Sequence, residues 1–380
     1  MRSPLPIYTL QVDPTLWQQM KFNVWSSHPA PALLRIEDGE EVRVGCCFRG
    51  AHTRVLLKKS YYLIDEEHGQ EVHLNAEYVD NSFIRNKLSL DFFRSIGVMS
   101  PRSRHVWLRI NDKDEGLYLA LESVNASFFR RRNKPRGSIH YAVNDDANFS
   151  RRNTRNEIKE DLLSGYERKE GVPCDDETLR NFLSWVNGTH TAIFREKIGN
   201  YLDVENYLRW LAGVVCTQNY DGFLHNYALY RNPLTGCFQI IPWDFDATWG
   251  RDCNGRVMKY NFVSIKGDNQ LSARLLAIPQ YRRRYCDILE VILHKYFHPK
   301  VLQPIIQHHY EQLAPYVYKD PYKPGLIKRF RHEHKQILAY IHQRRTYLLK
   351  QLKELSAHNK KYRETAYKRG HKHVTLSCSP

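Results

Sequence analysis

The residues best suited to chemistry lie in one stretch, Asn219–Asp252, which reads NYDGFLHNYALYRNPLTGCFQIIPWDFDATWGRD. Asp221 is followed five positions later by Asn226, and two strand-like runs then lead to Asp244 and Asp246. The Asn-Pro and the closing Gly between the runs are turn residues, so the pattern predicts a β-hairpin. A hairpin brings its ends side by side, so these side-chain oxygens would converge where a Mg²⁺ ion could bind.

The order of these residues matches the catalytic half of a protein kinase: Asp, an Asn five positions later, a hairpin, and then Asp-Phe-x. There the first Asp accepts the proton of the substrate hydroxyl, and the other two hold metal against the nucleotide phosphates. Asp and Asn are also common in turns, so an ordinary surface hairpin is the competing interpretation. Trp243 and Phe245 flank Asp244 with large apolar groups, where uncompensated charge is costly, and this favours a bound cation.

Cationic residues that could face phosphates lie nearer the N-terminus. Arg49 stands between glycines in GCCFRGAHTR, where Gly permits close backbone approach and Arg can clamp a phosphate; an ordinary basic hairpin is the favoured alternative for this segment alone. Lys58 and Lys59 interrupt the apolar run VLLKKSYYLI. Successive strand residues face opposite sides, so one lysine should point inward, as a phosphate-binding lysine does. An edge strand protected by lysines is the alternative. The alternation of strand residues does not show which of the two lysines points inward.

The surrounding elements predict two units. Period-two patterning over 32–64, a helix over 83–96 and a strand pair ending at Glu122 indicate a β-rich part with one helix. Glu122 would face a nucleotide or cap the strand end. After about residue 200 the spacing is mainly helical, with helices expected at 270–296, 299–317 and 324–356.

The fold class expected is therefore α+β: an atypical, protein-kinase-like, two-lobed fold with a β-rich N-lobe and a mainly helical C-lobe. The expected units are a lead-in at 1–30, an N-lobe at 31–124, a C-lobe at 125–357 and a basic tail at 358–380.

Composition limits the class of protein. The 380 residues carry 57 Lys and Arg against 41 Asp and Glu, a net charge of +16, which attracts phosphates, nucleic acid or acidic proteins. No apolar run is long enough for a transmembrane helix, and the first residues lack a signal-peptide profile. The eight cysteines show no metal-binding spacing, so reduced thiols are expected. Nucleic-acid binding is not expected, because no recognised motif accompanies the charge.

Five blocks in order, FRGAHTR…KKSY, LNAEYVDNSFIRNKLSLDFFRSIGV, GLYLALESV, NYDGFLHNYALYR and IIPWDFDATWGRD, closely resemble the spore coat CotH kinase family. The similarity spans roughly residues 40–255. It implies an atypical kinase that binds ATP with Mg²⁺ or Mn²⁺, phosphorylates serine-rich spore coat proteins and directs outer-coat assembly. Synthesis in the mother-cell cytoplasm and location in the spore coat follow from the same resemblance.

The resemblance also implies a role for single residues. Asp221 would be the catalytic, base-like Asp, and Asp244 the metal ligand. Asn226 would assist as a ligand, and Asp246 would be a second ligand or a hydrogen-bonding support. Arg49, in the loop, would contact the nucleotide. One strand lysine would do so as well, either Lys58 or, instead of it, Lys59. Glu122 would lie at the nucleotide edge between the lobes.

The chain departs from ordinary protein kinases in three places. No H-R-D triplet precedes Asp221, the metal motif is D-F-D instead of D-F-G, and no A-P-E segment follows. An acidic partner for the lysine is not obvious, with Glu77, Asp80 and Asp91 all possible. A coat-assembly scaffold that does not need catalysis is the main alternative function, and a metal-dependent nuclease is a weaker one.

Overall fold

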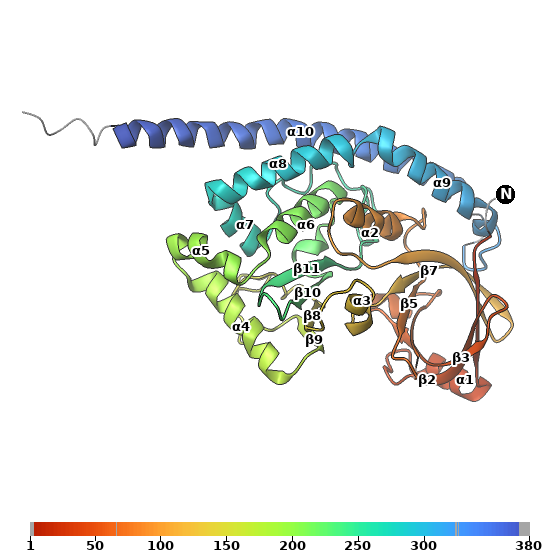
Figure 1. The fold of residues 1–380 in the computed structure, drawn as a ribbon. Coiled ribbons are helices and arrows are strands. Elements are labelled where there is room, and N and C mark those ends of the chain that lie inside the picture. Colours follow the sequence, from red (N-terminus) through yellow and green to blue (C-terminus); the bar gives the residue numbers. More distant parts are fainter. Residues whose placement is uncertain (1–3, 66, 324, 326, 372–380) are drawn as a thin grey trace, which may run out of the picture.

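The computed structural model describes residues 4–65, 67–323, 325 and 327–371. Figure 1 shows a closed barrel at one end of the molecule, a four-stranded sheet in the middle and helices around that sheet. The expected α+β class is confirmed. The β-rich half is a closed seven-stranded barrel, which the two-lobed kinase model did not anticipate.

The barrel follows the strand order β1-β2-β3-β4-β5-β7-β6, and β1 pairs in parallel with β6 to close it. Its interior is apolar because alternate residues point inward, as in the buried pattern of β1. A segment that the pattern alone assigns to a lead-in therefore supplies one barrel strand. The strands are β1 (Ile7–Val12), β2 (Ala30–Ile36), β3 (Glu41–Arg49), β4 (Ser60–Asp65), β5 (Glu71–Asn75), β6 (Ser103–Ile110) and β7 (Lys113–Glu122), with helix α1 (Pro14–Phe22) between β1 and β2.

The strand expected through Lys58 and Lys59 is wrong. Arg49 pairs with Ser60, so the residues between them leave the β3–β4 ladder as a loop that contains the short 3-10 helix His52–Val55. Gly50 turns the chain out of β3 with a φ of +98°, a conformation that side-chain-bearing residues rarely adopt. The apolar run is misleading because Val55 and Leu57 are 64% and 75% exposed on this loop.

Helix α2 (Arg85–Ser95) joins the barrel to the rest of the molecule. It confirms the helix expected at this place and packs against helix α6 (Val204–Thr217). Gly213 allows the approach, because a Cβ there would lie 2.3 Å from the ring of Phe93. The same ring meets Phe245 edge to face at a centroid distance of 4.8 Å, so α2 lies directly behind the D-F-D residues.

The second sheet has the order β11-β10-β8-β9. The expected hairpin is confirmed: Tyr227 pairs with Pro242 in an antiparallel ladder. The two remaining strands come from residues 125–200, where the sequence shows no clear strand pattern. The strands are β8 (Ser138–Ala142), β9 (Tyr166–Glu170), β10 (Tyr227–Arg231) and β11 (Phe238–Pro242).

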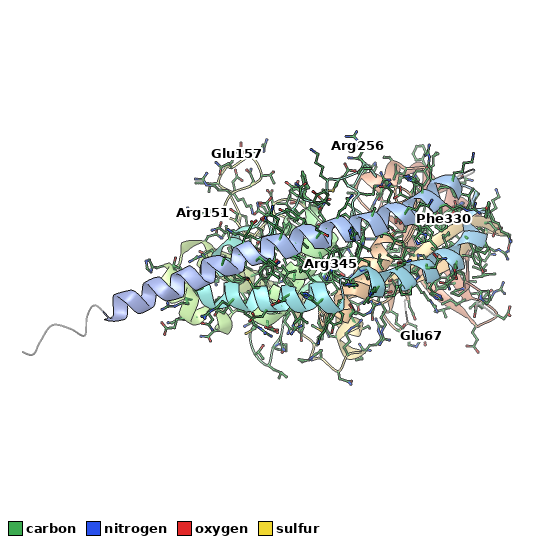
Figure 2. The ribbon with its side chains drawn as sticks, turned by 90° about the horizontal axis from the view of Figure 1, so that it is seen from above. Glu67, Arg151, Glu157, Arg256, Phe330 and Arg345 are labelled. Carbon is green, nitrogen blue, oxygen red and sulfur yellow. The ribbon has the colours of Figure 1, made fainter. Side chains whose placement is uncertain are left out.

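The long last helix, α10 (Ile327–His371), lies across the top of the molecule along α8 and α9 (Figure 2). It continues beyond residue 357 into the expected tail, of which 372–380 lie outside the described residues. None of the described helices is long and apolar enough to cross a membrane. The remaining helices are α3 (Ala126–Arg130), α4 (Pro173–Gly188), α5 (Thr191–Lys197), α7 (Gln270–Ala277), α8 (Pro279–Lys295) and α9 (Pro299–Val317).

Candidate active site

The D-F-D residues follow directly after β11 and are held from behind by α2. The backbone N–H of Phe245 donates to Oδ1 of Asn86 at 3.2 Å, and Thr248 Oγ1 donates to the Phe245 carbonyl at 2.7 Å. Asp244 adopts a φ of +56°. This turn, with Phe245 buried in the core, leaves Asp244 and Asp246 facing the barrel.

A narrow cleft with a volume of about 50 Å³ lies where the end of the barrel meets the D-F-D residues. It brings together four of the residues expected at the site: Arg49, Lys58, Asp244 and Asp246. The other lining residues are Gly50, Thr53, Leu56, Ser60, Asn75, Ala76, Glu77, Tyr78 and Val79. A larger groove of about 890 Å³ runs past Leu224 and Asp268 and includes none of the expected site residues.

Two carboxyl groups of the cleft, those of Asp246 and Glu77, lie in an environment that opposes their ionisation. Burial, and then the charge of Asp244, raise the pKa of Asp246 to about 8. Burial, with Asp246 and Asp80 nearby, raises the pKa of Glu77 well above its ordinary value. Glu77 Oε2 also has no hydrogen-bond partner among the described residues. The cleft therefore concentrates negative charge that the protein itself leaves partly uncompensated.

Asp221 stands half-buried at the start of a 3-10 turn. Burial raises its pKa, the charge of His225 opposes this, and Asp145 and Asp244 add to the increase. Asp221 likewise adds to the raised pKa of Asp246, so it lies within electrostatic reach of both D-F-D carboxylates.

Asn226 joins this group through the hairpin. Its φ is +62°, its backbone N–H donates to the Ala142 carbonyl at 3.2 Å, and its own carbonyl accepts from Trp243 N–H at 3.0 Å. Asn226 is therefore paired with the residue immediately before Asp244, as the hairpin predicted.

Arg49 is a cation that these carboxylates face. Burial lowers the pKa of its guanidinium, and the carboxylate of Asp244, followed by others in the cleft, opposes the shift. The guanidinium donates to Asn75 Oδ1 and lies 5.7 Å from the centroid of the Trp243 ring.

The two lysines have different surroundings. Lys58 points inward and is 1% exposed; its Nζ donates to Asp320 Oδ2 at 2.5 Å and to the Leu117 carbonyl at 2.7 Å. Lys59 instead donates to the carbonyls of Arg54 and Leu56, at 2.7 and 2.6 Å, and so braces the loop before β4. The inward residue is thus Lys58, and its acidic partner is Asp320 instead of Glu77, Asp80 or Asp91.

Glu122 is not among the residues that line the cleft. Its carboxylate forms ion pairs with Arg131 and Arg132 and accepts the backbone N–H of Arg102 at 3.0 Å. These contacts match the strand-end cap, the second of the two roles that the sequence left open.

Two contributors to the site carry no recognisable signal in the sequence. Asn86 bridges the D-F-D turn to Glu77, donating to Glu77 Oε1 at 3.2 Å. Asp320 reaches Lys58 from 262 positions away, too far for any local pattern. Glu77 was one of three candidates for the lysine partner, and the structure gives it a different place, in the cleft itself.

The described part of the chain contains no cluster of three or more His, Cys, Asp or Glu side chains that could hold a metal ion.

Comparison with known proteins places the chain in a family. The family model described as CotH kinase protein matches residues 47–348. The chain belongs to the CotH kinase family. It is 42% identical to inner spore coat protein H of Bacillus subtilis (strain 168) over 353 residues, which cover 91% of this chain and 97% of that protein. It is 26% identical to the inner spore coat protein H-like protein of the same organism over 286 residues, covering 74% and 80%.

Likeness to solved structures is weaker. The Helicobacter pylori proinflammatory kinase CtkA superposes with a TM-score of 0.30 at 10% identity, covering 77% of this chain and 94% of that one. HipA of a Shewanella oneidensis MR-1 toxin–antitoxin system gives a TM-score of 0.30 at 13% identity, with coverage of 87% and 71%. At these scores the likeness carries no conclusion about fold or activity.

Proposed function

We propose that this CotH-family chain is an ATP-dependent protein serine kinase, with a two-lobed kinase-like arrangement in which the barrel forms the nucleotide lobe. The observation that carries the proposal is the cleft in which Arg49 faces Asp244 and Asp246, with Asp221 within electrostatic reach of both carboxylates. Phosphoryl transfer needs this kind of site: positioned cations for the phosphates, carboxylates for metal, and an acceptor for the hydroxyl proton.

The substrates we propose are serine-rich spore coat proteins. The relative with 42% identity bears the name inner spore coat protein H, so we place this chain in the spore coat, after synthesis in the mother-cell cytoplasm. Phosphorylation of coat proteins there would direct outer-coat assembly. The net charge of +16 would also draw the protein towards phosphorylated or acidic coat components.

The residues present fit a divalent cation. Burial keeps Asp246 and Glu77 protonated, and a bound cation would favour their ionised forms. One Glu77 oxygen, without a hydrogen-bond partner among the described residues, would be available to it. Asp244 and Asp246 would hold the Mg²⁺ or Mn²⁺, with Asn226 assisting. When bound, the ion would neutralise charge on the nucleotide phosphates.

The protein's own residues would do the remaining work. Arg49 would bind a phosphate oxygen through its planar guanidinium, and Lys58 would add positive charge from beneath the cleft. Asp221 would accept the proton of the substrate hydroxyl. Its raised pKa suits this role, because a base works best when its pKa approaches the working pH.

A catalytically dispensable coat scaffold is a second candidate. The buried pair of Lys58 and Asp320 favours it, because the ammonium is already neutralised within the protein. The two candidates differ in one respect: the kinase needs the cleft carboxylates for its function, and the scaffold does not.

Separate substitutions of the two carboxylates test the kinase proposal. Asp221→Asn should keep metal-dependent ATP binding and lower transfer by roughly 10²–10⁴-fold, the usual contribution of a positioned base. Asp244→Asn should lower both, because it removes a metal ligand. The measurement is transfer of labelled phosphate to a coat-protein extract, beside calorimetric binding of ATP with Mg²⁺. Asp287→Asn, an exposed aspartate of α8, is the matched control. Wild-type transfer by Asp221→Asn would refute the catalytic role, and a wild type without transfer would favour the scaffold.

A further inference from the structure

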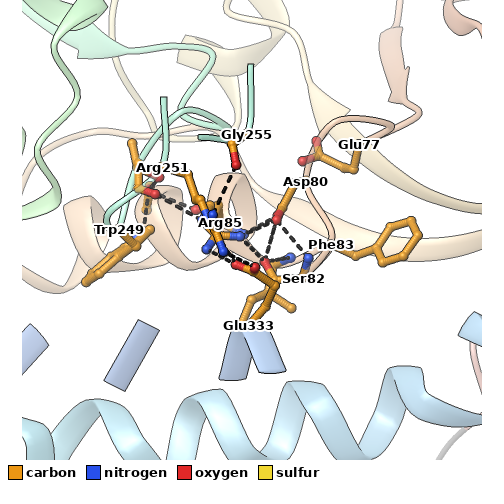
Figure 3. Close-up of polar contacts among 12 residues, drawn as sticks. Glu77, Asp80, Ser82, Phe83, Arg85, Trp249, Arg251, Gly255 and Glu333 are labelled. Atoms are coloured by element: carbon orange, nitrogen blue, oxygen red, sulfur yellow. Dashed lines mark hydrogen bonds and ion pairs between the residues drawn. The ribbon is translucent and has the colours of Figure 1, made fainter. Parts of the chain in front are cut away.

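A buried cluster of charges joins the start of α2, the loop after the D-F-D residues and α10 (Figure 3). Arg85, which begins α2, is 1% exposed. Its Nε donates to the Thr248 carbonyl at 3.0 Å, and its Nη1 donates to the Asp80 carboxylate and to Ser82 Oγ. Its Nη2 donates to the carboxylate of Glu333, which lies on α10. One guanidinium thus contacts three separate segments.

The segments that Arg85 contacts carry the candidate site. Thr248 follows Asp246 by two positions, and its hydroxyl holds the Phe245 carbonyl. Asp80 ends the short segment that begins with Glu77, whose side chain accepts a hydrogen bond from Asn86, the next residue of α2. The position of Arg85 therefore decides where the D-F-D turn lies relative to the barrel.

Glu333 balances two guanidinium groups at once. It is 3% exposed and pairs with Arg85 and also with Arg251, which donates onward to the Gly255 carbonyl at 3.2 Å. Without the Glu333 carboxylate, Asp80 is the only ion-pair partner left to Arg85 among the described residues, and the cavity beside the pair, about 10 Å³, holds at most about one water. A buried cation without its partner is strongly unfavourable, so the guanidinium groups would shift.

We propose that Glu333 is a positioning residue for phosphoryl transfer: through Arg85 and Arg251 it fixes the turn that presents Asp244 and Asp246. The inference rests on the proposed function, and it makes α10, near the other end of the chain, part of the site. Glu333 does not line the cleft; among the described residues its ion pairs are with the two arginines, and it shares the small cavity beside them with Asp246.

Three variants test this role. Glu333→Gln keeps the side-chain size and removes the charge, and Glu333→Asp keeps the charge but withdraws it by one methylene. Glu354→Gln changes an exposed glutamate of the same helix and is the control. The readouts are hydrogen exchange of the backbone amides of residues 244–252, the Mg²⁺ concentration that gives half-maximal transfer at saturating ATP, and the melting temperature.

The expected result is a graded loss at the site. Glu333→Gln should raise the Mg²⁺ requirement by about 10-fold, as loss of a group that orients metal ligands commonly does. Exchange over 244–252 should rise more than in the barrel strands. Glu333→Asp should fall between wild type and Glu333→Gln, and Glu354→Gln should match wild type.

Unchanged exchange over 244–252 together with an unchanged Mg²⁺ requirement in Glu333→Gln would overturn the proposal. So would a lower melting temperature with exchange raised evenly over the whole chain, which is the result for a merely structural glutamate. If Glu333→Gln does not fold, Glu333→Asp decides, and wild-type behaviour in both readouts overturns the role. If the wild type transfers no phosphate, the kinase proposal fails, while exchange over 244–252 still decides whether Glu333 positions the turn.

Discussion

At the scale of single residues, the cleft contains three acidic side chains, those of Glu77, Asp244 and Asp246, and few cations. Burial and Asp244 raise the pKa of Asp246 to about 8, while Arg49 remains a charged group that faces both. Burying these acidic groups reduces the stability of the folded state. Groups in a cleft with strongly shifted pKa values are typical of functional sites. The cost should be visible in how stability depends on pH.

The contribution of Asp246 to the free energy of unfolding should fall as the pH rises from about 4 to about 8. In this window folded Asp246 keeps a proton that an ordinary aspartate, with a pKa of about 3.9, has released in the unfolded chain. The folded state then binds more protons than the unfolded state, so raising the pH favours unfolding. Calorimetric melting between pH 5 and pH 8 should show a steeper loss for wild type than for Asp246→Asn. All other titrating groups are common to both chains, so equal slopes would contradict the assignment.

At the scale of elements, the connection between α9 and α10 holds the barrel. Asp320 accepts from Lys58 and from the Leu117 N–H, and Tyr322 donates to Glu115 at 2.6 Å. Lys323 donates to the carbonyls of Glu77 and Asp80, each at 3.0 Å. Burial lowers the pKa of Lys323 to about 7. The connection between α9 and α10 therefore places ionisable groups beside Lys58 and Glu77, two residues that line the cleft.

Loss of the Asp320 charge should destabilise the whole protein. Asp320→Asn leaves Lys58 uncompensated at 1% exposure, and breaking a buried ion pair on one side costs about 3–5 kcal/mol. The double variant Lys58→Met with Asp320→Asn should recover part of this loss, because the unpaired cation is then absent. Urea unfolding of both single variants and the double variant measures the coupling. Asp38→Asn, in an exposed turn, is the control; purely additive losses would show that the pair is not coupled.

At the scale of the whole molecule, α10 ties the barrel to the helical part. Near its start Glu333 reaches the D-F-D loop, and further along Tyr340 and Arg344 donate to the carbonyls of Cys216 and Val215 in the last turn of α6. Those carbonyls have no partner within their own helix, so α10 completes the end of α6. That end leads directly into Asp221.

Truncation should separate the two ends of α10. The buried side chains described in α10 all lie before residue 357: Phe330, Glu333, Ile337, Tyr340, Ile341, Arg344, Leu348, Leu352 and Leu355. A chain that stops after residue 357 should melt cooperatively near the wild-type temperature, whereas one that stops after residue 326 should not fold. Thermal unfolding followed by circular dichroism distinguishes them. Cooperative melting of the shorter chain would show that α10 is dispensable.

Local patterns were sufficient for the elements near the chemistry. The hairpin β10–β11, helix α2 and the helical character after residue 270 follow from turn residues and from apolar spacing, because a hairpin and an amphipathic helix are each specified within a few residues. The single helix expected at 270–296 is wrong in one respect: it is divided into α7 and α8, and α8 begins at Pro279. The same hairpin pairs the backbone of Asn226 with Trp243, the residue before Asp244. The family, too, is apparent from the motifs alone and is confirmed by the match over 47–348.

Tertiary structure alone decided how the charges pair and how the barrel closes. β1 reaches β6 across the chain, Lys58 meets Asp320 from 262 positions away, and Arg85 meets Glu333 from 248. No local period encodes such contacts, because the energy of a buried charge depends on what surrounds it in space. Lys58 therefore looked like a strand residue aimed at phosphate, whereas the folded chain gives it a carboxylate from the α9–α10 connection and leaves Arg49 facing the cleft carboxylates.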